Sequence, residues 1–369
     1  MGSNPLFNSN KMKLGIIALN CSHGSTITDV ENAWQMNWLD TKSVAQMADN
    51  AGFEVLLPVA RWKGYGGVTN FNNKTFDTFT WASAISAITE YSCIFSTVHV
   101  PLVHPVAAAK QCATIDHVSN GRFALNIVCG WFRNEFEMFS AEWREHDVRY
   151  EYASEWLTLI QRLWSEDKEF TYKGRWFETK GAWSEPKPLQ KPSVPIMNAG
   201  GSEAGKKFAA SSADMSFVLL KDRDFEGGRK QVEHLKSMAR AVNREIDVWV
   251  HAYVVCRDTE QEARDYLNYY VKERGDKTAV NNLLQIFGLN SQTLPSDVLD
   301  EYRFHFIAGH GGYPLIGTAD QIVEEIEILI KMGVNGILIS WVDYLGECRQ
   351  WIEKVIPVME QAGQREPKN

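Results

Sequence analysis

Short apolar segments alternate with helical segments along nearly the whole chain, and this alternation limits the fold more than any other sequence feature. Eight segments have the length and near-continuous apolar character of strands buried on both faces. They are Leu14–Leu19, Phe53–Val59, Ile94–Val100, Arg122–Val128, Pro195–Asn198, Asp214–Leu219, Ile246–Val255 and Gly336–Ser340. The helical segments are Thr41–Asn50, Phe76–Thr89, Pro105–Val118, Tyr150–Trp164, a helix after Ser202, Phe225–Val242, Glu260–Glu273, Ala319–Lys331 and Glu347–Gln361. The pattern predicts an α/β fold, a (β/α)8 TIM barrel.

A single domain accounts for this pattern, although 369 residues would allow two. We expect residues 13–362 to form the barrel, with residues 277–316 as an insertion before the eighth strand. Residues 1–12 are polar and without periodicity, so we expect a flexible N-terminal tail, and residues 363–369 a C-terminal tail.

Charge and cysteine usage exclude several classes of protein. The net charge is −8 and no basic cluster is present, which argues against nucleic acid or an anionic membrane as a partner. No apolar run reaches the roughly 18 residues that a spanning helix needs. The six cysteines are scattered without a CxxC pair, which suits reduced thiols in a cytoplasmic protein.

The stretch from Ala113 to Tyr150 carries the densest chemistry. It contains a helix end, a turn at Asn120-Gly121, the strand Arg122–Val128 and a long loop rich in acids and aromatics. In parallel α/β folds the loops that follow the strands build the functional site. We therefore expect the site at this loop and its neighbours.

Two polar side chains, Thr97 and Asn126, lie inside otherwise apolar strands. A buried polar group needs a hydrogen-bond partner, so each is either a core residue satisfied by neighbouring backbone or a residue that faces the site. Two helix starts are also suited to anions. Arg149-Tyr150 opens one helix, and Gly200-Gly201-Ser202 precedes another, although most such turns only cap a helix.

The motif ATID-x-x-S-x-GR-x-x-x-N-x-V-x-GW, followed by Glu135 and by HD-x-RY ending at Tyr150, resembles the bacterial-luciferase-like family of flavin-dependent monooxygenases. The resemblance extends from Lys13 to about Val358. Within the family the chain looks most like pyrimidine monooxygenases and dimethylsulfone monooxygenases. This implies a luciferase-type TIM barrel, a homodimer or homotetramer, that receives reduced FMN from a separate NAD(P)H-dependent flavin reductase. With dioxygen as co-substrate, it would act through a flavin-bound peroxide.

The resemblance also implies roles for individual residues. Thr97 and Asn126 would contact the flavin edge and hold dioxygen, between apolar walls formed by Leu57 and Trp131. Contacts to FMN are implied at Ala60, Arg61, Asn126, Glu135, Arg149, Tyr150 and Ser202. Without the resemblance, Leu57 and Trp131 would be interpreted as core residues, Arg61 as a surface cation, and Glu135 and Arg149 as parts of a solvated loop and first helical turn.

The substrate stays open at this point. Thr97 and Ala199–Ser202 favour a small carbonyl or N-heterocyclic substrate, as in the pyrimidine enzymes. Gly130–Arg133 and Glu145–Asp147 favour an organosulfur substrate of the dimethylsulfone or alkanesulfonate type, with cleavage of a carbon–sulfur bond. A deazaflavin-dependent oxidoreductase and a non-catalytic flavin-binding protein are further alternatives. No histidine spacing suggests a metal site, and Gly309–Tyr313 is a candidate lid over the flavin.

Overall fold

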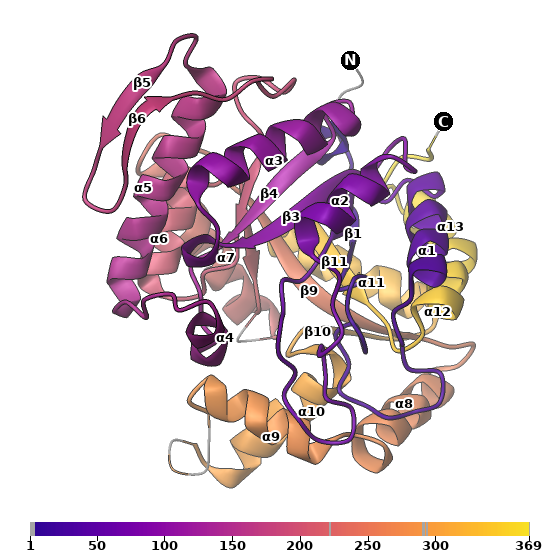
Figure 1. Cartoon of the computed structure of the whole chain (residues 1–369). Coiled ribbons are helices and arrows are strands. Elements are labelled where there is room, and N and C mark those ends of the chain that lie inside the picture. Colours follow the sequence, from indigo (N-terminus) through magenta and orange to yellow (C-terminus); the bar gives the residue numbers. More distant parts are fainter. Residues whose placement is uncertain (1–3, 221–222, 290–291, 293, 369) are drawn as a thin grey trace.

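The computed structural model describes residues 4–220, 223–289, 292 and 294–368. Within these ranges eight parallel strands close into a barrel, which confirms the predicted TIM-barrel fold (Figure 1). Around the barrel the order is β1, β2, β3, β4, β7, β8, β9 and β11, and β11 pairs again with β1. Their bounds are β1 Lys13–Ile17, β2 Val55–Leu57, β3 Cys93–His99, β4 Phe123–Val128, β7 Ile196–Asn198, β8 Met215–Val218, β9 Asp247–Cys256 and β11 Gly336–Ser340.

Helices surround the barrel and bury its outer face. Their bounds are α1 Trp38–Asn50, α2 Thr78–Ser86, α3 Pro105–Val118, α5 His146–Ser165, α6 Glu203–Ser212, α7 Phe225–Arg240, α11 Ala319–Lys331, α12 Tyr344–Gln350, the π-helical η4 Trp351–Val355, and α13 Ile356–Gln361. The short α4 Arg133–Met138 and the 3-10 helix η2 Val100–Leu102 follow β4 and β3. None of the helices in the described part of the chain combines the length and apolar character needed to cross a bilayer.

Local chemistry explains where several elements begin and end. Strand β1 stops at Ile17 because Ala18 has a φ of 65°, outside the extended region. Strand β2 ends before Pro58, which has no N–H for a strand ladder. Helix α1 starts earlier than its apolar periodicity predicts, because the Asn37 side chain caps it by accepting from the Asp40 N–H.

The insertion folds as a helical layer with one strand of its own. It continues from α8 Glu260–Asn268 and the π-helical η3 Tyr269–Glu273 into α9 Lys277–Ile286, α10 Ser296–Gly309 and β10 Tyr313–Gly317. Strand β10 was not predicted. It pairs in parallel with the second half of β9, outside the closed barrel, with Tyr313 opposite Ala252. The strand has only five residues and a proline at its second position, so its sequence lacks the apolar pattern from which the other strands were predicted.

Buried hydrogen bonds attach the insertion to the barrel loops. The Asp276 carboxylate accepts from the Thr69 N–H at 2.7 Å and from the Ala279 N–H at 3.0 Å, while the Asn282 amide donates to the Tyr65 carbonyl at 2.7 Å. The candidate lid Gly309–Tyr313 is an ordered turn between α10 and β10, entered through His310 in the left-handed conformation. The insertion is thus fixed to the loop that follows β2.

Within the expected N-terminal tail, residues 4–6 and Met12 are buried against the barrel, whereas Phe7, Ser9 and Lys11 are exposed. Pro5–Phe7 forms the 3-10 helix η1, and Leu6 is only 2% exposed among the side chains inside the barrel. Glu54 accepts hydrogen bonds from Asn8 and Asn10 and from the Leu14 N–H. The expected C-terminal tail is also packed at Gln364 and Arg365, both buried.

A hairpin follows α5. Strands β5 Phe170–Lys173 and β6 Glu178–Ala182 pair antiparallel. The turn between them covers residues 174–177, where Glu155 of α5 accepts from the backbone N–H groups of residues 175–177.

Candidate active site

Thr97 and Asn126 lie side by side in the barrel, on neighbouring strands. The β3–β4 register places them directly opposite one another. The Asn126 Nδ2 donates to Thr97 Oγ1 at 3.1 Å, and Thr97 Oγ1 donates to the Pro58 carbonyl at 2.5 Å. The Asn126 side-chain oxygen has no hydrogen-bond partner among the described residues, although the residue is only 4% exposed. A buried acceptor without a partner in the protein is a position that can accept a hydrogen bond from a ligand or from an ordered water.

The two predicted apolar walls belong to different clusters of the core. Leu57 is buried inside the barrel with Phe95 and Trp249. Trp131 packs with the insertion, where its ring is stacked on Phe287 with centroids 4.7 Å apart and planes 9° apart. Leu57 therefore belongs to the barrel interior, and Trp131 links the loop after β4 to α9.

Arg61 and Glu135, both predicted as FMN contacts, form a buried ion pair with each other. Arg61 Nη1 lies 2.9 Å from Glu135 Oε2, and the Trp62 and Lys63 N–H groups donate to Glu135 Oε1 at 2.8 and 3.2 Å. Both oxygens of Glu135 are thus occupied by the protein. The Glu135 carboxylate therefore holds the loop after β2 against α4. The buried Ala60 lies in this loop, next to Arg61.

Neutral imidazoles surround this ion pair. Burial, and then the charge of Arg61, lower the pKa of His99 to about 3 and that of His310 to about 4. The Arg61 guanidinium also lies over the Trp131 ring, 4.5 Å from its centroid. The environment of Arg61 is therefore aromatic and without net charge at neutral pH.

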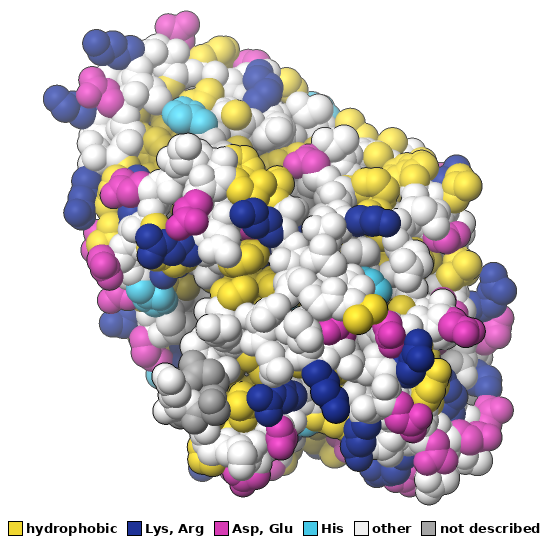
Figure 2. All heavy atoms as spheres, turned by 60° about the horizontal axis from the view of Figure 1, so that its bottom comes forward, with side chains coloured by type: hydrophobic (Ala, Val, Ile, Leu, Met, Phe, Trp, Pro, Cys, Tyr) yellow, Lys and Arg dark blue, Asp and Glu magenta, His cyan; other side chains and the backbone are white. Residues whose placement is uncertain are grey.

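Figure 2 shows that acidic and basic side chains are intermixed on the face that carries the insertion.

Arg149, in the first turn of α5, spans from that helix to the end of β4. Its Nη1 donates to the Gly130 carbonyl, and its guanidinium lies over the Trp143 ring at 4.5 Å. Its Nε is buried without a partner in the described residues. Gly130 has a φ of 98°, and a Cβ there would collide with the Phe136 ring. Arg149 thus retains one unused donor at the site.

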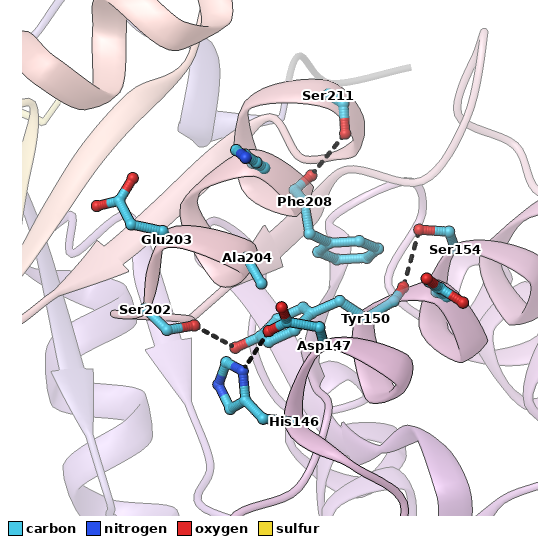
Figure 3. Close-up of a pocket in the computed structure, with 11 residues that line it drawn as sticks. His146, Asp147, Tyr150, Ser154, Ser202, Glu203, Ala204, Phe208 and Ser211 are labelled. Atoms are coloured by element: carbon cyan, nitrogen blue, oxygen red, sulfur yellow. Dashed lines mark hydrogen bonds and ion pairs between the residues drawn. The ribbon is translucent and has the colours of Figure 1, made fainter.

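Tyr150 and Ser202 meet where α5 and α6 begin (Figure 3). Their hydroxyl oxygens are 3.5 Å apart, and Ser202 caps α6 by accepting from the Gly205 N–H at 3.1 Å. A Cβ at Gly200 or Gly205 would lie 2.9 or 2.7 Å from the Tyr150 hydroxyl oxygen. Both glycines are therefore required for Tyr150 to reach Ser202.

A pocket of about 460 Å³ opens at this meeting point, between α5 and α6. Its lining combines the hydroxyls of Tyr150 and Ser202 with His146 and Lys207, around the N-terminus of α6, where the helix dipole favours an anion. The remaining lining residues are Asp147, Glu151, Ser154, Glu203, Ala204, Phe208 and Ser211. Two hydroxyls, a lysine and a helix N-terminus in this lining suit a phosphate group, although the carboxylates of Asp147, Glu151 and Glu203 also belong to the lining.

Several residues that build the site were missed by sequence reasoning. Asn198 accepts from the Gly200 N–H at 2.9 Å and donates to the Ile127 carbonyl at 2.8 Å, which shapes the turn before Ser202. His251 of β9 lies 2.9 Å from Ser340 of β11, and burial lowers the pKa of His251 to about 3. A polar residue in an apolar strand, the signal used for Asn126, would also have found His251.

The described residues contain no cluster of three or more potential metal ligands. The predicted residues fall instead into three groups. Thr97, Asn126 and Leu57 lie in the barrel, and Arg149, Tyr150 and Ser202 lie near the pocket between α5 and α6. The ion pair of Arg61 and Glu135 lies with Trp131 and the insertion.

Comparison with known proteins identifies the family of the chain. A family model described as luciferase-like monooxygenase matches residues 12–336. The FMNH(2)-dependent dimethylsulfone monooxygenase of Pseudomonas fluorescens is 31% identical over 93% of both chains. The pyrimidine monooxygenase RutA of Acinetobacter baylyi is 25% identical over 94% of this chain and 95% of the relative. Among solved structures, a riboflavin lyase complex with modified FMN and riboflavin superposes with a TM-score of 0.86 at 20% identity, covering 96% of this chain and 93% of the other.

Proposed function

The chain belongs to the luciferase-like monooxygenase family, and on this premise we propose that it is a two-component monooxygenase using reduced FMN and dioxygen. The observation that carries the proposal is a pair of polar positions at the site that can bind a ligand. One is the phosphate-suited pocket entrance at Tyr150 and Ser202, and the other is the unpaired oxygen of Asn126. The name of the dimethylsulfone relative, which specifies FMNH(2), supports the same cofactor.

The residues present fit FMN at both ends of the molecule. Ser202, Tyr150 and the free N–H groups of α6 would hold the phosphate, with Lys207 supplying a positive charge. Asn126 would meet a polar atom of the ring system, and Arg149 has an unused Nε donor for a further polar atom. Bound FMN supplies the redox chemistry with dioxygen, while these side chains place it.

Exclusion of water is the second contribution of the protein. Trp131, Phe287 and Phe306 form a row of aromatic contacts from the loop after β4 to α10. Asp276 fixes the insertion in that position. A dry site limits the wasteful formation of hydrogen peroxide, so a fixed aromatic cover favours productive oxygenation.

For the substrate we propose a small neutral molecule. Arg61 is neutralised by Glu135, and His99, His251 and His310 are held neutral by burial. The described residues around Arg61 therefore offer no unpaired charge to an alkanesulfonate anion, and the charges of Arg149 and Lys207 are assigned above to FMN. The higher identity to the dimethylsulfone relative moves our preference from a carbonyl or N-heterocyclic substrate to a sulfone. A pyrimidine is the second candidate, because Thr97 and Ala199–Ser202 match that group.

Product analysis with isotopically labelled dioxygen tests the proposal. The protein would be incubated with a flavin reductase, NADH, FMN and each of dimethylsulfone, uracil and methanesulfonate. We expect one labelled oxygen atom in the product from dimethylsulfone or uracil, and none from methanesulfonate. Oxygen-independent turnover with a reduced deazaflavin would support the deazaflavin alternative, and FMN binding without turnover would support a binding protein.

The partner and the assembly are also part of the proposal. We propose that a separate NAD(P)H-dependent reductase supplies the reduced FMN, and that the chain acts as a homodimer or homotetramer in the cytoplasm. Analytical ultracentrifugation would give the assembly. Turnover that required no added reductase would contradict the two-component arrangement.

A further inference from the structure

The pocket between α5 and α6 is longer than the phosphate group that we place at one end of it. Its volume is about 460 Å³, which is within the range of sites that bind a whole small molecule. At 1.5 Å per residue, α6 extends about 13 Å from Ser202 to Ser211, and both serines line the pocket (Figure 3). Within the described part of the chain, the lining comes from α5, from α6 and from the N-cap of α6, and from no barrel strand. The pocket therefore offers space on the side of the phosphate that is away from the barrel.

Lys207 brings a positive charge into this space. Its neighbour Lys206 is paired with Glu203 at 2.7 Å, whereas Lys207 has no ion-pair partner among the described residues. Lys207 lies about 7.5 Å further along α6 than Ser202, which caps the helix. Because a lysine side chain is long and flexible, it can pair at this distance with a second phosphate that is linked to the first.

Several polar groups of the lining offer a ligand only hydrogen-bond acceptors. The Ser154 hydroxyl donates its hydrogen to the Tyr150 carbonyl at 2.9 Å, so it can offer a ligand only its lone pairs. Glu151 is paired with Arg175 at 2.9 Å, which neutralises its charge and leaves further lone pairs on its oxygens. Acceptors of this kind bind hydroxyl and amino groups, and carboxylates bind the ribose hydroxyls in many nucleotide sites. The lining thus suits a sugar next to a second phosphate.

We propose that this pocket binds the adenylate half of FAD, so that the chain accepts FAD as well as FMN. Lys207 would pair with the second phosphate, while Glu151 and Ser154 would accept hydrogen bonds from the ribose hydroxyls or the adenine amino group. A tail that carries several carboxylates fits less well, because Asp147, Glu151 and Glu203 line the same pocket. This inference rests on the proposed function, because it starts from the phosphate position of the bound flavin.

Two flavins that differ only beyond the first phosphate test the inference. The whole protein would be titrated by calorimetry, without oxygen, with reduced FMN and with reduced FAD. We expect FAD to bind about tenfold more tightly than FMN, the factor that one further hydrogen bond to a charged group contributes. FAD that bound no more tightly than FMN would overturn the inference. Failure to bind either flavin would instead overturn the proposed function.

A matched pair of variants tests where the adenylate half lies. Ser154→Trp fills the pocket, and we expect it to lower FAD affinity about tenfold and to leave FMN affinity unchanged. Thr158→Trp is the control, because Thr158 is also exposed on α5 and donates to the carbonyl one turn earlier, at 2.8 Å, but does not line the pocket. It should change neither affinity. The thermal midpoint of each variant without flavin checks that it is folded. Equal losses of FMN and FAD affinity in folded Ser154→Trp would place the adenylate half outside this pocket and overturn the inference.

Discussion

Arg61 and Glu135 form an ion pair of 2.9 Å whose side chains are 3% and 0% exposed. Two backbone N–H groups, of Trp62 and Lys63, complete the hydrogen bonding of the carboxylate. Water therefore has almost no access to either charge, and each depends on the other for its stability in the folded chain.

Replacing Glu135 with Gln leaves the Arg61 charge buried without its counterion. We expect the free energy of unfolding to fall by about 3–5 kcal/mol, the usual result of removing one member of a buried pair. Chemical denaturation monitored by tryptophan fluorescence would measure it. Glu137→Gln is the control, because Glu137 pairs with Arg133 at the surface and both side chains are more than 60% exposed. Equal stability of the two variants would contradict the role of Glu135.

Stability should fall as the pH drops from about 6.5 towards 4. Burial lowers the pKa of His99 to about 3, below the value near 6.5 of an unfolded histidine. The unfolded chain therefore takes up a proton in this range and the folded chain does not, which favours unfolding. Thermal midpoints measured across this range should depend less on pH in His99→Gln than in the unchanged protein. His117→Gln, at an exposed position, should leave the pH dependence of the thermal midpoint unaltered. If His99→Gln also left it unaltered, the contribution assigned to His99 would be contradicted.

The glycines beneath Tyr150 should control affinity for the phosphate. In Gly205→Ala the new Cβ would lie 2.7 Å from the Tyr150 hydroxyl oxygen, so the tyrosine must move away from Ser202. We expect FMN affinity to fall by about tenfold or more, the effect of losing one good hydrogen bond to a charged group. Riboflavin, which has no phosphate, should bind this variant and the unchanged protein alike.

Gly201→Ala is the matched control for this test, since no atom lies within 4 Å of its added Cβ. Fluorescence titrations with both ligands would give the four affinities. A loss of riboflavin affinity equal to that of FMN would place the effect outside the phosphate position.

Phe287→Ala should increase the leakage of reducing equivalents from NADH to dioxygen, which forms hydrogen peroxide. The Trp131–Phe287 stack joins the loop after β4 to the insertion, and such a stack contributes about 1 kcal/mol beyond burial. Losing it would loosen the aromatic cover and admit water. Peroxide formed per NADH consumed, in the coupled assay with a reductase, measures this leakage. Val118→Ala, at an exposed position at the end of α3, should show no increase, and an equal increase in both would contradict the assignment.

The barrel could be predicted from the sequence because its strands are continuous apolar runs. The predicted Ile94–Val100 and the observed Cys93–His99 differ by one residue at each end. Asn126 could be found because an amide inside such a run is conspicuous. Thr97 was found by the same signal. Its hydrogen bond to Asn126 was not predicted, because it depends on the register of β3 against β4, and the proposed roles of both residues came from the family resemblance.

Interactions between distant positions could not be predicted. Arg61 and Glu135 are 74 positions apart, and His251 and Ser340 are 89 apart. No local pattern specifies which partner a buried charge or imidazole finds. The direction of the Asn126 amide likewise depends on a proline carbonyl that has no side-chain signature. The packed N-terminal residues were missed because their asparagines bind Glu54, a contact that hydrophobic periodicity does not register.

Both ends of the chain lie together on the side of the molecule away from the insertion (Figure 1). The Asn10 side chain accepts from the Glu366 N–H at 2.8 Å, so the two ends are joined to one another as well as to the barrel. For protein engineering this means that a reductase domain or an immobilising support can be fused at the C-terminus without covering the insertion. A fusion at the N-terminus should be made ahead of Asn4, because Leu6 packs among the side chains inside the barrel.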